Sequence, residues 1–214
     1  RADWDAAWDV IQTDPEAARV SILLPASSFP QRGDTVSDYS SRGPRAIGGQ
    51  FLVKPNITAP GTDILAAYAA NAGGATATAL QNGTSMSSPH MAGAAVLVRA
   101  VRPDWTPLEV HSAINMTAKM DGVIVASGQP AGPWDFGSGR VDLTRAALSG
   151  LVMDENDANF IAANPSASGD IASLNLVDLT EAECATTCSF TRTLRNTSLL
   201  DEDWTLDASG LPVG

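Results

Sequence analysis

Basic residues, cysteine, histidine and long apolar runs are all scarce in this chain of 214 residues. It has 13 Lys and Arg against 24 Asp and Glu, a net charge of −11, so a nucleic-acid partner is disfavoured because its phosphates would be repelled. Two Cys and two His are too few for a zinc site unless all four take part. The longest apolar stretch, Met91–Val101, is broken by Gly93 and Arg99, whereas a membrane span needs about 20 apolar residues. No membrane span is therefore predicted.

What the sequence does contain is typical of a globular protein. Hydrophobic residues make up 44% and charged residues 17% of the chain. A disordered protein has the opposite composition, with low hydrophobicity and high charge, so this composition argues against disorder. A length of 214 residues exceeds the common domain size of roughly 100 to 150, so we expect one large domain or one domain with part of another. The chain opens at Arg1 with neither an initiator methionine nor a signal peptide, and we expect it to be a portion of a longer protein.

Acidic residues are unevenly distributed along the chain. Residues 1–150 hold 13 acidic and 11 basic side chains, whereas residues 151–214 hold 11 acidic and 2 basic ones. Such an asymmetry indicates a change of module, and it places a domain boundary near Gly150.

Several short segments are predicted to be extended or looped. Apolar and β-branched residues predict strands, while proline, glycine and small polar residues predict turns and loops. The segments are a strand over Arg19–Leu24, a loop or linker over Ala26–Asp38, extended pieces over Ile57–Ala59 and Ile64–Ala67 around a Pro60-Gly61 turn, a surface loop over Ala69–Thr78 and a strand over Phe190–Asn196.

Three helices are predicted. Met91–Val98 is apolar on every side, which is typical of a helix enclosed by protein at the centre of a fold. Thr106-Pro-Leu-Glu109 has the threonine, proline and glutamate of a capping box, so a helix of about three turns should follow it. A shorter helix is expected over Asp142–Leu148, ending at Gly150.

The most informative segment is Asn82-Gly-Thr-Ser-Met-Ser-Ser-Pro-His-Met-Ala-Gly93. It places Ser85 at or just before the start of the apolar helix, and it places Pro89 where we expect the first helical turn to tolerate it. Unpaired N–H groups and the positive end of the helix dipole would stabilise negative charge beside the serine oxygen, as an acyl-transfer nucleophile requires. From spacing alone, a simple N-cap serine explains the same residue, because serine is a favoured cap.

Three sets of residues together resemble the subtilisin-like serine peptidases. Gly83-Thr-Ser-Met-Ser-Ser-Pro-His90 is similar to the nucleophile motif of that family. Asp38-Tyr-Ser-Ser-Arg-Gly-Pro44 and Lys54-Pro-Asn-Ile-Thr-Ala-Pro-Gly61 resemble the paired segments before the nucleophile, although Asn56 stands where the resemblance leads us to expect aspartate. Trp134-Asp-Phe-Gly-Ser-Gly-Arg-Val-Asp142 resembles the closing segment of the catalytic domain. The likeness therefore covers roughly residues 36–150.

The resemblance implies an α/β fold, with a mainly parallel sheet and flanking helices that are incomplete in this chain, and it implies that Ser85 is the catalytic nucleophile. The family's triad runs Asp, His, Ser along the chain, but His90 and His111 both follow Ser85. His90 lies about 140° around and ~7.5 Å along the same helix, so its ring cannot face the serine hydroxyl. We interpret His111 as a structural or surface residue. The triad Asp and His are therefore expected upstream of Arg1.

Other parts of the family's catalytic equipment are not found in the sequence. The oxyanion asparagine should also precede the serine, but Asn56, Asn71 and Asn82 stand in other contexts, which leaves the backbone N–H of Ser85 as one donor. No substrate-binding residue, metal ligand or cofactor is assigned. Calcium is possible by family resemblance, but no acidic cluster has the spacing of calcium ligands.

The resemblance divides the chain into three regions. Residues 1–37 are similar to the tail of an inserted, protease-associated-like region, with a long surface insertion or linker as the alternative. Residues 38–150 correspond to the C-terminal half of the catalytic domain, and residues 151–214 resemble the start of a fibronectin-like module of the β-sandwich type.

The function implied is that of a secreted or extracytoplasmic serine endopeptidase that hydrolyses protein or peptide substrates through an acyl-enzyme at Ser85. Its expected partner is the N-terminal part of the same protein, and the chain alone should be inactive because a serine hydroxyl needs a positioned base. The alternative is a non-catalytic binding or structural protein that retains the fold. The intact Gly83-Thr-Ser85 sequence favours the enzyme.

Cys184 and Cys188 are predicted to form a disulfide, which suits an oxidising, extracytoplasmic compartment. Because the loop that it closes is small, we expect a stabilisation of ~2 kcal/mol, confined to residues 151–214. Mass spectrometry of unreduced peptides should find the two cysteines cross-linked. Two free thiols in protein secreted through an oxidising compartment would contradict the prediction.

Overall fold

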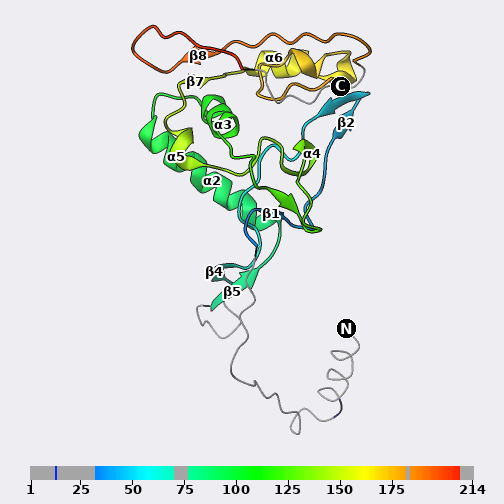
Figure 1. Ribbon diagram of the computed structural model, residues 1–214, viewed down its shortest axis with the longest axis vertical. Coiled ribbons are helices and arrows are strands. Elements are labelled where there is room, and N and C mark those ends of the chain that lie inside the picture. The colour runs from blue at the N-terminus through cyan, green and yellow to red at the C-terminus, as the bar shows by residue number, and fades with distance from the viewer. Residues whose placement is uncertain (1–12, 14–31, 70–76, 182–183, 208–214) are drawn as a thin grey trace. The chain divides into compact units, whose positions relative to one another are not determined.

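The computed structural model describes Thr13 and residues 32–69, 77–181 and 184–207. The chain divides into two compact units, residues 1–33 and residues 34–214. The elements labelled in Figure 1 belong to the second unit. The strand predicted over Arg19–Leu24 and part of the loop predicted over Ala26–Asp38 lie outside the described residues.

The second unit contains one long helix and several short ones. Their bounds are α2 Thr84–Val101, α3 Pro107–Met116, α4 Pro133–Phe136, α5 Leu143–Ala146 and α6 Asp157–Ala162, with 3-10 turns η1 Pro165–Ala167 and η2 Ile171–Ser173. The three predicted helices are present as α2, α3 and α5, although α5 is shorter than predicted. α3 and α5 both contact α2 and one another (Figure 1). Among the described residues, no helix is long and apolar enough to cross a membrane.

The described strands are short and pair two by two. Their bounds are β1 Thr35–Val36, β2 Arg45–Ile47, β3 Gln50–Leu52, β4 Ile64–Tyr68, β5 Ala77–Gln81, β6 Ile124–Val125, β7 Leu151–Val152 and β8 Arg195–Asn196. β1 and β6 are parallel, with Thr35 opposite Ile124, whereas β2–β3, β4–β5 and β7–β8 are antiparallel. Helices and small sheets of this kind fit the α/β class, but the described residues do not by themselves form a mainly parallel sheet.

Predictions of extended and looped segments were correct in part. β4 confirms the piece predicted over Ile64–Ala67, whereas Ile57–Ala59 forms only a single parallel bridge, between Thr58 and Arg140. β1 lies inside the predicted loop Ala26–Asp38, and β5 includes the end of the predicted loop Ala69–Thr78. β1 was missed because its partner, β6, is far away in the sequence, and a local pattern does not reveal such a pairing.

α3 begins with the predicted capping box. The Thr106 side-chain oxygen accepts a hydrogen bond from the Glu109 backbone N–H at 3.1 Å, and Glu109 Oε2 accepts one from the Thr106 backbone N–H at 2.9 Å. Pro107 fits the first helical position because a missing N–H there loses no intrahelical bond. The start of α3 is therefore specified by local sequence alone.

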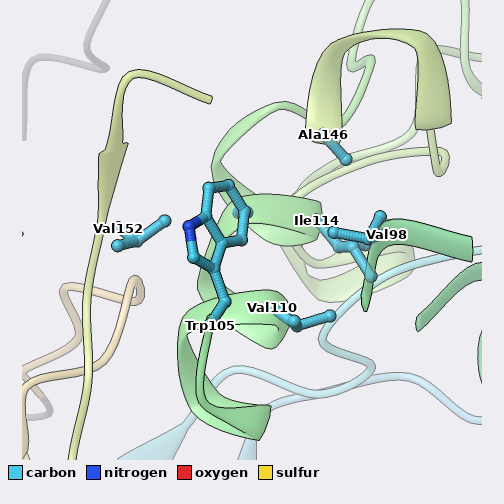
Figure 2. Close-up of a cluster of buried hydrophobic side chains, with 7 residues drawn as sticks. Val98, Trp105, Val110, Ile114, Ala146 and Val152 are labelled. Carbon is cyan, nitrogen blue, oxygen red and sulfur yellow. The ribbon is translucent and has the colours of Figure 1, made fainter. Parts of the chain in front are cut away.

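α3 is also the centre of the larger hydrophobic cluster. Trp105, just before α3, is 1% exposed and lies between Val152 on one side and Ile114 and Val98 on the other (Figure 2). The cluster comprises Val98, Trp105, Val110, Ala113, Ile114, Ala146 and Val152. Its residues come from α2, α3, α5 and β7, so the cluster holds these elements together. Truncating a buried aromatic such as Trp105 costs about 3–5 kcal/mol.

The prediction that the apolar helix is enclosed on every side was wrong for the described residues. Val98 is buried in the cluster with residues of α3 and α5, and Ala94, one turn before it, is also buried. On other faces Val96 is 67%, Leu97 59% and Val101 62% exposed. The uniformly apolar sequence reports the surface that α2 can bury, whereas the described residues cover one stripe of it.

Residues 190–194 are not a strand, although a strand was predicted over Phe190–Asn196. The Arg192 guanidinium instead donates hydrogen bonds to the carbonyl oxygens of Ala172, Leu176 and Asp178. It also lies 5.5 Å from the centroid of the Phe190 ring. Side-chain bonds to a neighbouring loop thus replace a strand ladder there, and regular pairing begins only at Arg195. Nearby, Cys184 and Cys188 form the predicted disulfide.

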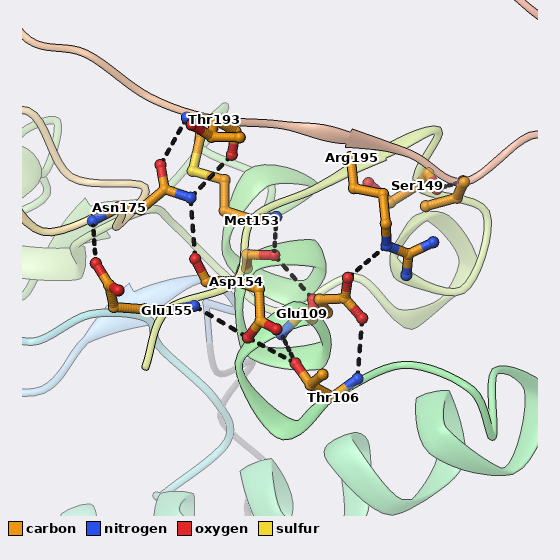
Figure 3. A network of polar contacts seen from close by, with 11 residues as sticks. Thr106, Glu109, Ser149, Met153, Asp154, Glu155, Asn175, Thr193 and Arg195 are labelled. Carbon is orange, nitrogen blue, oxygen red and sulfur yellow. Dashed lines mark hydrogen bonds and ion pairs between the residues drawn. The ribbon is translucent and has the colours of Figure 1, made fainter. Parts of the chain in front are cut away.

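A polar network attaches the residues after Gly150 to the beginning of α3 (Figure 3). Its bonds run from Arg195 Nε to Glu109 Oε1 at 2.5 Å, from Thr106 Oγ1 to Asp154 Oδ1 at 2.8 Å and from the Met153 backbone N–H to Ser112 Oγ at 2.8 Å. Glu109 is 5% exposed, and its pKa is lowered chiefly by the hydrogen bond from Arg195. One glutamate thus caps α3 and anchors β8.

Replacing Arg195 tests this anchor. Arg195→Ala in the complete protein should lower the free energy of unfolding at neutral pH by about 1 kcal/mol, a modest value because the Arg195 side chain is 46% exposed and solvent screens the pair. Because the pKa of Glu109 is lowered in the folded state, this contribution is present above the ordinary glutamate pKa of about 4.3 and disappears as pH falls through the lowered value.

Urea titrations at several pH values make the measurement, and Arg45→Ala is the matched control, since Arg45 is exposed and has no ion pair within the described residues. A loss of stability for Arg195→Ala that is unchanged at acidic pH would contradict the role of the ion pair. So would a loss no larger than that of Arg45→Ala.

Candidate active site

Ser85 is the second residue of α2, and the N-cap is Gly83. This position excludes the alternative in which Ser85 caps the helix, because no side chain makes a cap hydrogen bond at this end of α2. Ser85 is exposed, and within the described residues its hydroxyl makes no hydrogen bond. The hydroxyl is therefore free to meet groups that the described residues do not supply.

The surroundings of Ser85 favour negative charge. Its backbone N–H has no acceptor within the described residues, as is usual in a first helical turn, and that turn has no acidic residue to offset the positive helix end.

Pro89 lies in the helix interior and not in the first turn as predicted. Because proline has no N–H, the Ser85 carbonyl oxygen lacks its usual helical donor.

The segment Ala59–Asp63 holds the turn before α2 in place. The Gly83 backbone N–H donates to the Gly61 carbonyl oxygen at 2.8 Å, and Ser87 Oγ donates to the Ala59 carbonyl oxygen at 2.9 Å. The Asp63 backbone N–H also donates to the Asn82 side-chain oxygen. Hydrogen bonds to residues on both sides of Ser85 thus fix the position of its backbone relative to Ala59–Asp63.

Two glycines permit this close approach. A Cβ on Gly61 would lie 2.3 Å from Ser87 Oγ and 2.8 Å from the Gly83 carbonyl oxygen, so no larger residue fits without displacing the turn. Gly83 has a φ of 154°, a conformation that other residues rarely adopt. Sequence reasoning identified Pro60-Gly61 only as a turn and missed its contact with the turn before Ser85. The sole signal for this contact was the family-like order of the motifs Lys54–Gly61 and Gly83–His90.

Neither histidine is paired with Ser85. The His90 ring lies on its own helix, with Nδ1 2.8 Å from the Met86 carbonyl oxygen. The His111 ring lies against Asn115, whose side-chain nitrogen is 3.1 Å from Nε2. Packing around the His111 ring, and then the charge of Lys54, lower its pKa. Both rings are therefore engaged elsewhere, as the sequence predicted.

Asn56, found where aspartate was expected, belongs to a separate polar cluster. Its side-chain nitrogen donates to the Val53 carbonyl oxygen at 3.3 Å and to Asp178 Oδ2 at 3.4 Å, while its oxygen accepts from Lys54 Nζ. Burial raises the pKa of Asp178, and Lys54 and Asn56 partly offset that effect. An amide at position 56 can donate to this half-buried carboxyl group, whereas a second carboxylate would repel it.

The other candidate residues do not complete a catalytic site. The Asn82 side-chain oxygen is occupied by the Asp63 backbone, and Asn71 lies outside the described residues. No group of three or more His, Cys, Asp or Glu side chains that could hold a metal occurs in the described part of the chain. The described residues thus present a serine at a helix start without a base beside it.

Comparisons with known proteins agree with the motifs. The family model described as "Subtilase family" matches residues 11–151. Subtilisin-like protease SBT1.7 of Arabidopsis thaliana is 36% identical over 177 residues, which is 73% of this chain and 23% of the relative. Subtilisin-like protease SBT1.6 of the same plant is 32% identical over 166 residues, or 71% of this chain and 22% of the relative.

A shorter match has higher identity. Subtilisin-like protease SBT3.11 of Arabidopsis thaliana is 42% identical over 127 residues, which is 56% of this chain and 16% of the relative. The chain thus spans less than a quarter of the length of these relatives. The extent of the family match, together with the serine motif at the start of α2, leads to one conclusion: the chain belongs to the subtilase family.

Proposed function

We propose that the complete protein is a secreted serine endopeptidase that cleaves protein or peptide substrates through an acyl-enzyme at Ser85. The observation that supports this best is the state of Ser85 itself. Its hydroxyl and its backbone N–H are both unoccupied within the described residues, at the first turn of α2 and beside a turn fixed by Gly61. Membership of the subtilase family supplies the reaction class.

In the proposed reaction, Ser85 Oγ attacks the carbonyl carbon of the scissile peptide bond while a histidine accepts the hydroxyl proton. The carbonyl oxygen becomes an oxyanion, and the Ser85 N–H and the positive end of α2 stabilise it. The histidine then gives its proton to the leaving amine, which leaves an ester at Ser85. Water hydrolyses that ester by the reverse proton transfers.

We further propose that the triad Asp and His come from a part of the protein upstream of Arg1. Two features of the described residues support this: neither histidine contacts Ser85, and an apolar face of α2 around Val96, Leu97 and Val101 is uncovered. An N-terminal part of the same protein that covered this face would bring the missing groups to the start of α2 and complete a mainly parallel sheet. Without it, this chain should hydrolyse no peptide bond at an enzymatic rate.

The proposal of secretion is supported by the Cys184–Cys188 disulfide, since disulfides persist in oxidising compartments. Residues 151–214 as the start of a fibronectin-like module, and residues 1–37 as the tail of an inserted region, stay predictions about the whole protein. β7–β8 is the described strand pair after Gly150 that such a β-rich module would extend.

A serine-directed fluorophosphonate probe tests the proposed function. The chain alone and the complete protein should be treated with the probe, together with a Ser85→Ala variant of the complete protein. We expect labelling at Ser85 in the complete protein only, because the probe reports a serine activated by a base. Ser85→Ala should abolish labelling and lower turnover on the order of 10⁶-fold, as loss of the nucleophile does in subtilisin.

A matched control tests whether labelling is specific to Ser85. Ser88→Ala changes a neighbouring exposed serine of α2 and should leave labelling intact. Labelling of the chain alone, or peptidase activity retained by Ser85→Ala, would overturn the assignment. A complete protein that folds but is never labelled would instead support the non-catalytic alternative.

Oxidation of Met86 should lower turnover of the complete protein. Met86 follows Ser85 directly in α2, and its sulfur lies 3.8 Å from the place where a Cβ on Gly83 would be. A polar sulfoxide at this residue should therefore crowd the oxyanion position next to Ser85. After peroxide treatment, turnover of the wild type should fall several-fold and that of Met86→Ala should not. Met120→Ala is the control, because Met120 is 61% exposed and lies outside the site. Equal sensitivity of wild type and Met86→Ala would refute the prediction.

A further inference from the structure

One carbonyl oxygen connects Tyr39 to the turn before Ser85. The Gly61 carbonyl oxygen accepts the Gly83 backbone N–H at 2.8 Å and the Tyr39 hydroxyl at 2.8 Å. Gly83 is the N-cap of α2 and precedes Ser85 by two residues. The two donors come from segments far apart in the sequence and meet at the same acceptor.

The Tyr39 hydroxyl belongs to a chain of hydroxyl groups with a defined direction. It lies 2.6 Å from Thr62 Oγ1, which lies 2.9 Å from Ser37 Oγ. Since the single Tyr39 proton goes to the Gly61 carbonyl oxygen, the Thr62 hydroxyl must donate to Tyr39, and Ser37 must then donate to Thr62. Hydrogen bonds that follow one another in this way polarise and strengthen each other.

The position of Gly61 matters because the turn leaves no room for adjustment. A Cβ on Gly61 would come within 2.8 Å of both Ser87 Oγ and the Gly83 carbonyl oxygen, so Gly61 already lies at closest approach to the residues on either side of Ser85. A shift of Gly61 would therefore move Gly83 and, with it, the start of α2. Displacing a catalytic group by about 1 Å can cost on the order of 10²-fold in rate.

We propose that Tyr39 is a positioning residue for Ser85, acting through the Gly61 carbonyl oxygen, in the peptidase reaction on whose proposal this inference rests. The aromatic ring alone cannot fulfil this role, because only the hydroxyl reaches Gly61 and Thr62. Tyr39 is 47% exposed, and water competes for its hydrogen bonds, so the contribution is modest.

The test is Tyr39→Phe in the complete protein, with Tyr68→Phe as the matched control. Tyr68 is 55% exposed on β4, and its hydroxyl makes no hydrogen bond within the described residues. For Tyr39→Phe we expect kcat on a peptide substrate and the rate of fluorophosphonate labelling to fall about five-fold, with KM unchanged. The unfolding midpoint should equal that of Tyr68→Phe, whose kcat should match the wild type.

Changes at Thr62 test whether the hydroxyl chain is the cause. Thr62→Val keeps the shape and removes the hydroxyl, so kcat should fall, whereas Thr62→Ser should retain wild-type kcat. The double variant Tyr39→Phe with Thr62→Val should be no slower than Tyr39→Phe alone, because Thr62 acts on the Gly61 carbonyl oxygen only through the Tyr39 hydroxyl.

An unchanged kcat in Tyr39→Phe, or a loss explained by a matching fall in KM or in folded fraction, would overturn the positioning role while leaving the proposed function in place. Thr62→Ser as slow as Thr62→Val would also overturn it. A wild-type protein that is not labelled at Ser85 would overturn the proposed function itself, and the positioning role with it.

Discussion

The contact between Gly61 and Gly83 is the constraint on which the rest of the site depends. The 2.8 Å hydrogen bond between their backbones depends on two glycines, because a Cβ on Gly61 would lie 2.8 Å from the Gly83 carbonyl oxygen and because Gly83 has a φ of 154° that other residues rarely adopt. It sets where α2 begins, and α2 in turn sets where the Ser85 hydroxyl and N–H lie. A serine can be exposed and unbonded and still be fixed, because the backbone on both of its sides is held.

α3 has the corresponding role in the fold. Its first turn is closed by Thr106 and Glu109, and the same Glu109 pairs with Arg195, so the residues after Gly150 attach to a helix that is already capped. The hydrophobic cluster around Trp105 adjoins this junction, because Trp105 directly precedes Thr106 in the chain. The far end of α2 packs into that cluster through Val98, which links the site to the core.

Local signals in the sequence were sufficient for some features and not for others. The capping box, the helices α2, α3 and α5 and the place of Ser85 follow from residues a few positions apart, and each was predicted, whereas the short helices α4 and α6 were not. The β1–β6 pairing and the contact of Ala59–Asp63 with the serine turn join distant segments, which a local pattern does not specify. The strand predicted around Arg192 failed because an alternating pattern cannot show that a guanidinium will bind loop carbonyls instead.

Trapping the acyl-enzyme tests the central claim most directly. The complete protein should be mixed with a slowly deacylating peptide ester, quenched in acid and digested, and the modified peptide sequenced by mass spectrometry. The proposed mechanism predicts a single acyl adduct on Ser85 that forms at the rate of the initial burst. Turnover with an adduct on another residue, or with none on Ser85 at any time, would contradict it.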